Sequence, residues 1–103
     1  MDAQEFVALW KAEKRLVQEE LRHGTGAAAQ QFRALELSEG QSQKLWEAMD
    51  TALTDVFYSL LLGLDGAAAI GGEQHDYQLR EEGGNLISGN GEIEAEAFEQ
   101  FHS

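Results

Sequence analysis

The chain has 103 residues, a common size for a single domain, and 43% of them are hydrophobic, so it is able to bury one core. Nineteen acidic residues against seven basic ones give a formal net charge of −12, which excludes most nucleic-acid and membrane-surface binding and favours basic protein partners. With no cysteine, disulfides and thiolate chemistry are also excluded. We therefore expect one cytoplasmic domain over residues 1–103, without a targeting or membrane-spanning segment.

The first predicted element is an amphipathic helix over residues 3 to 22, which Gly24 should end. Its apolar side gathers Phe6, Leu9, Trp10, Leu16, Val17 and Leu21. Glu13 falls in the middle of this stripe. A buried carboxylate at Glu13 would indicate a functional site, whereas a carboxylate that reaches the edge of the stripe or pairs with Arg33 would be structural. The next segment, residues 27 to 35, predicts a short second helix.

A long third helix is predicted over residues 39 to 62. Ser38 and Gln41 match a capping box, in which each side chain bonds to the other residue's backbone N–H group. Apolar side chains then recur with a helical period, and the most apolar turns, YSLLLGL, should lie at the centre of the core. The recurring residues are Leu45, Met49, Leu53, Val56, Phe57 and Leu60.

A glycine-rich segment, GLDGAAAIGG, follows this helix. Gly66 and Gly71 have the spacing of a phosphate-binding loop, but Gly72 and Glu73 stand where that motif needs Lys and then Ser or Thr. We interpret the segment as a packed connection in which residues 67 to 70 form a short strand. The alternative is a small-ligand or catalytic pocket, lined by Asp65, Gly66, Gly71, Gly72, His75 and Asp76.

The segments YQLR and NLIS flank EEGG, a pattern that predicts a β-hairpin. The last segment, GNGEIEAEAFEQFHS, predicts a closing helix with Ile93, Ala97, Phe98 and Phe101 on one side. Together these elements predict an α+β fold with three or four helices and a small C-terminal antiparallel hairpin, to which residues 67 to 70 add a third short strand.

No standard enzyme signature is present. Ser38 is explained as a helix cap, and no serine lies in a G-x-S-x-G motif. His23, His75 and His102 lack the spacing of metal ligands, so we expect no metal, no cofactor and no catalysis.

The acidic charge is concentrated near the C-terminus, where residues 73 to 103 carry eight acids and one base. The leading hypothesis is a non-enzymatic protein-binding module, such as an inhibitor or immunity-type protein that masks a basic partner. Its predicted contacts are Tyr77, Glu81, Glu82, Glu92, Glu96 and Glu99. Besides the glycine-loop pocket, a third hypothesis is a structural subunit that self-associates through the apolar surface of its long helix.

Overall fold

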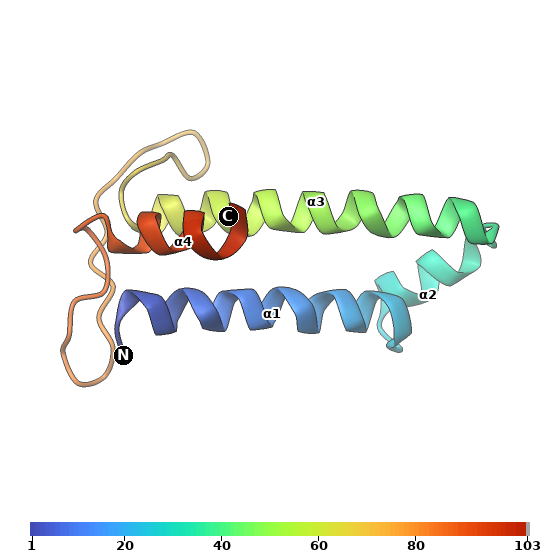
Figure 1. Cartoon of the computed structure of the whole chain (residues 1–103), viewed down its shortest axis with the longest axis horizontal. Coiled ribbons are helices and arrows are strands. Elements are labelled where there is room, and N and C mark those ends of the chain that lie inside the picture. Colours follow the sequence, from blue (N-terminus) through green and yellow to red (C-terminus); the bar gives the residue numbers. More distant parts are fainter. Residues whose placement is uncertain (103) are drawn as a thin grey trace.

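The computed structural model describes residues 1–102 and contains four helices: α1 (Ala3–His23), α2 (Ala27–Ala34), α3 (Glu39–Leu64) and α4 (Glu92–His102). The long helices α1 and α3 form an antiparallel hairpin, with α2 in the connection at one end. At the other end, α4 packs against both long helices (Figure 1). All four predicted helices are therefore confirmed.

The ends of the helices follow local hydrogen-bonding rules. The Asp2 side chain accepts a hydrogen bond from the backbone N–H of Glu5 and so caps the start of α1. The capping box predicted at the start of α3 is present, because the Ser38 side chain accepts from Gln41 N–H and the Gln41 side chain accepts from Ser38 N–H. Gly24 follows the last residue of α1 and donates its N–H to the Glu20 carbonyl.

The predicted α+β class is wrong, because residues 1–102 contain no strand and the fold is all-α. At the expected hairpin, only an isolated bridge joins Arg80 to Leu86. At the next pair away from the turn, Leu79 and Ile87 do not complete a ladder. Instead, the Ser88 hydroxyl accepts from Leu79 N–H at 2.7 Å and donates to the Tyr77 carbonyl at 2.7 Å. A buried side chain thus takes the place of the backbone partner that a second strand would offer.

The third strand predicted over residues 67 to 70 is also absent, and the only pairing there is a bridge between Ile70 and Glu73. Gly71 and Gly72, with φ angles of 63° and 85°, form the turn inside this bridge. Ile70 folds back over Gly63 of α3, where a Cβ atom would collide with the isoleucine side chain. The segment is therefore a tight turn packed on a helix.

The core lies at the end of the hairpin that α4 covers. Its buried hydrophobic residues come from α1, α3, α4 and the preceding loop: Ala3, Val7, Leu61, Ile87, Ile93 and Ala97. Trp10 of α1 packs edge-on against Phe57 of α3, with the ring centres 5.8 Å apart. The prediction that the last turns of α3 lie in the core holds for Leu61, which is fully buried, whereas Leu60 is 37% exposed.

The rest of the hairpin is a two-helix arm with few buried side chains. Lys14 and Gln18 of α1 both donate to the Asp50 carboxylate of α3, at 2.8 and 2.7 Å. Near the α2 end, the Trp46 ring contacts Phe32, and the Arg22 guanidinium lies 5.4 Å from its centre. The radius of gyration is 16.2 Å, against about 13 Å for a compact domain of this length. The elongated shape shows that the arm lacks a covering layer.

Asp65 holds α4 in place on the hairpin. It follows the last residue of α3 and is 8% exposed. One oxygen accepts from Gly89 N–H at 2.6 Å, and the other accepts from Glu94 N–H in the first turn of α4 at 3.0 Å. The residue before α4 is Gly91, which has no side chain to cap the helix. The Asn90 side chain accepts from Glu92 N–H at 3.0 Å, and the Asp65 carboxylate just after α3 accepts from Glu94 N–H.

We expect Asp65→Ala to lower the free energy of unfolding by about 1–3 kcal/mol, because it leaves two partly buried N–H groups without an acceptor. Asp65→Asn, which keeps one acceptor oxygen, should lose less. Urea unfolding followed by circular dichroism measures both effects. The control is Asp55→Ala at an exposed position of α3, expected to change stability by less than about 0.5 kcal/mol. An equal loss in the control would contradict the capping role.

Candidate interaction surfaces

The residues predicted to contact a basic partner lie on two neighbouring segments. Glu92, Glu96 and Glu99 lie on α4 at i, i+4 and i+7, so they share one side of the helix. Glu81 and Glu82 lie in the turn before α4, and Tyr77, which is 37% exposed, precedes that turn. The acidic residues of α4 thus form one group, whereas the turn residues form another.

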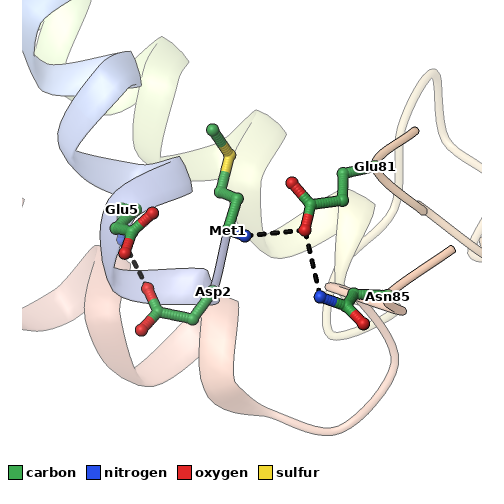
Figure 2. Close-up of polar contacts among 5 residues, drawn as sticks. All are labelled: Met1, Asp2, Glu5, Glu81 and Asn85. Atoms are coloured by element: carbon green, nitrogen blue, oxygen red, sulfur yellow. Dashed lines mark hydrogen bonds and ion pairs between the residues drawn. The ribbon is translucent and has the colours of Figure 1, made fainter. Parts of the chain in front are cut away.

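Glu81 is engaged within the fold (Figure 2). Its Oε1 atom accepts from the Met1 ammonium group at 2.6 Å and from the Asn85 side chain at 3.0 Å. The hydrogen bond from the ammonium group is the main reason why the Glu81 pKa is lowered. The Glu81 carboxylate therefore links the turn to the start of α1.

The six residues of the alternative pocket have separate roles. Asp65 is committed to the two backbone N–H groups described above, and Gly71 and Gly72 form a turn. Gly66 has a φ angle of 78° and lies against Asp76. His75 is exposed, with its Nε2 atom 3.3 Å from Glu73. These contacts explain the glycine-rich segment as a packed connection.

Residues 1–102 offer neither a metal site nor a membrane-spanning helix. No three histidine, aspartate or glutamate side chains there lie close enough together to hold a metal ion. No helix in that range is both long and apolar enough to cross a membrane.

An exposed apolar surface lies on the arm, and it includes residues of the apolar stripes predicted for the first and the long helix. We define the apolar face as Leu9 and Leu16 of α1 together with Leu45, Met49, Val56 and Leu60 of α3. Leu9 is 55% exposed, Leu16 is 63% exposed and Val56 is 51% exposed. The periodicity of both helices is visible in the sequence, but periodicity alone does not show that no third helix covers these side chains.

The opposite side of the hairpin is covered or polar. Near α4, Tyr58 of α3 stacks against His102. Further along, Gln18 of α1 lines an open polar groove of about 890 Å³ between the two long helices. Leu16 is two residues from Gln18, and Val56 is two residues from Tyr58. Because two residues turn a helix by about 200°, the apolar face points away from α4 and the groove.

Glu13 and Glu20 lie within the α1 part of the apolar face. With Leu9 and Leu16 they follow a spacing of four, three and four residues, which places all four on one side of the helix. Both glutamates are exposed. Arg33, which the sequence offered as a partner for Glu13, donates instead to the Gly24 carbonyl. Glu13 is therefore a surface carboxylate among apolar side chains.

No protein-family model, curated protein or solved structure matches this chain.

We expect the ion pair between Met1 and Glu81 to stabilise the fold only while both groups are charged. The pKa of Glu81 is lowered from its ordinary 4.5. The stabilisation that the charged Glu81 provides is therefore complete above pH 4.5 and is lost as the pH falls through the lowered value. The pKa of the Met1 ammonium is raised from 8.0, mainly by its bond to Glu81. The stabilisation that the charged Met1 ammonium provides is complete below pH 8.0 and is lost as the pH rises through the raised value.

Glu81→Gln should therefore lower the melting temperature between about pH 4.5 and 8.0 and have little effect well outside that window. Thermal unfolding across the pH range measures the difference from the natural chain. Glu82→Gln at the neighbouring exposed position is the control. A difference that does not vary with pH would show that the ion pair does not contribute.

Proposed function

We propose that this protein is a non-enzymatic helical interaction module that binds another protein through the apolar face of its arm. The observation that carries the proposal is the exposure of Leu9, Leu16 and Val56 on one side of two adjacent helices. Single exposed apolar residues are common, but several exposed apolar residues gathered on one side of two adjacent helices are typical of a protein-binding surface.

The size of the apolar face is compatible with a specific complex. The helix α1 has 21 residues and so is about 31 Å long, and two packed helices are about 20 Å wide. Their common face, taken as a flat rectangle, therefore has an area on the order of 600 Å², to which the uneven side-chain surface adds. Specific complexes bury about 800 Å² per partner, so a complex would use the whole of this face.

The test replaces apolar side chains that are already exposed, so the fold should be retained. In the double variant Leu16→Glu with Val56→Glu, two carboxylates would be desolvated in any complex formed through the apolar face. We expect at least a hundredfold loss of binding, or about 2.7 kcal/mol. Partners captured with the tagged chain from a lysate, and the mass of the purified chain, are measured at low and high salt. An apolar complex should survive high salt.

The matched control is Ala8→Glu with Thr51→Glu, which adds the same charge at exposed positions outside the apolar face. Circular dichroism checks that both double variants remain folded. The proposal is wrong if the two double variants bind other proteins equally and also self-associate equally.

The acidic end is a second candidate surface. Residues 65 to 102 carry nine acids and one base, and Phe98 of α4 is 55% exposed among them. An exposed aromatic ring with surrounding carboxylates is suited to a basic protein, because the ring supplies contact area while the charges steer the encounter. This candidate keeps the inhibitor hypothesis drawn from the sequence.

For this second candidate, Glu92→Gln, Glu96→Gln and Glu99→Gln together should slow the association rate of a captured basic partner about tenfold at low salt, because they remove long-range attraction. Stopped-flow or surface-based kinetics measures the rate, and the dissociation rate should change little. An unchanged association rate at low salt would exclude the acidic residues of α4 from binding.

A further inference from the structure

The partner of the apolar face is constrained by two carboxylates within it. Glu13 and Glu20 are seven residues apart on α1, so their Cα atoms are separated by about 10 Å along one side of the helix. Together with Leu16, Val17 and Leu21, they line an open depression of about 250 Å³. This depression combines an apolar floor with two acidic residues.

Neither glutamate is neutralised by this chain. Among residues 1–102, the ion pairs involve other carboxylates, and Lys14 of α1 is paired with Asp50. Glu20 accepts one hydrogen bond, from Gly26 N–H to its Oε1 atom at 3.1 Å. That bond holds the Glu20 side chain without cancelling its charge. A cation supplied from outside the chain would therefore be favourable at both positions.

We infer that the occupant of the apolar face is an amphipathic helix of another protein, with two basic residues seven positions apart that pair with Glu13 and Glu20. This inference depends on the proposed function. The apolar face extends over residues 45 to 60 of α3, so a helix of about 16 residues, roughly 24 Å long, would span it. Its apolar side would cover the leucines and Val56, and its basic residues would fix the register.

A second copy of this chain is a poorer match. It would bring another net charge of −12 and its own Glu13 and Glu20 to the interface, with no basic residue on the apolar face to pair with them. Like charges brought together in an interface are unfavourable, by up to several kcal/mol. The basic residues of α1, such as Arg22 above Trp46, lie outside the apolar face.

The test uses two synthetic 18-residue amphipathic peptides of identical composition, each with a leucine stripe and two lysines seven positions apart. In one peptide the lysines border the stripe, and in the other they lie on the opposite side of the helix. Fluorescence anisotropy measures the binding of each peptide to the intact chain. We expect the bordering-lysine peptide to bind about tenfold more tightly, equivalent to roughly 1.4 kcal/mol.

The double variant Glu13→Gln with Glu20→Gln should remove this tenfold preference, while the glutamine at position 20 can still accept from Gly26 N–H. The control Glu19→Gln with Glu39→Gln removes the same charge from residues of the polar groove and should keep the preference. Equal binding of the two peptides, no binding of either, or equal effects of the two variants would overturn the inference.

The mass of the purified chain distinguishes a failure of this inference from a failure of the proposed function. A value of twice 11.4 kDa that returns to 11.4 kDa in the Leu16→Glu and Val56→Glu variant would identify a second copy as the occupant. The inference would then be wrong while the proposed function stood. A monomer that binds nothing through the apolar face would overturn both.

Discussion

The arrangement of the whole chain depends on how α4 is attached. Asp65 at the end of α3 supplies the acceptors for Gly89 N–H and for Glu94 N–H in the first turn of α4, so the end of one helix fixes the start of another. Because α4 has only 11 residues, it is about 16 Å long, whereas α3 is about 39 Å long. A helix fixed at this end covers less than half of the hairpin. The length of α4 thus limits the covered core to one end of the hairpin, and the apolar face is exposed because α4 packs on the opposite side.

The two sides of the arm then differ in chemistry. One side continues from α4 into a polar groove, where Lys14 and Gln18 bind Asp50 across the hairpin. The other side carries exposed leucines and Val56. The polar contacts, the edge-on contact of Trp46 with Phe32 and the Arg22 guanidinium near the Trp46 ring help to hold the arm together. The chain therefore keeps its long helices paired while leaving apolar side chains in contact with solvent.

The sequence predicted what depends on local physics. Helix boundaries were accessible because Ser38 with Gln41 and the glycine after α1 act on their own neighbours. The β-hairpin failed because glycines between two apolar runs indicate a turn, whereas the Ser88 hydroxyl, nine residues from Leu79, decides how the flanking backbone bonds. Asp65 was assigned to a pocket for a similar reason. Its partner Glu94 lies 29 residues away, so the sequence does not show that the carboxylate is already bonded. Likewise, the position of Glu13 in the stripe was visible, but its exposure follows from α4 packing on the other side of the hairpin.

The charge of the chain and its apolar face are connected. An exposed apolar surface promotes aggregation, and a large net charge opposes it, because approaching copies repel one another before their apolar faces meet. Here the carboxylates of Glu13 and Glu20 place part of that repulsion on the apolar face itself. In the proposed complex the same charges would attract a cationic helix, so one feature would disfavour a second copy and favour a basic partner. On this view the acidic composition contributes to partner selection as well as to solubility.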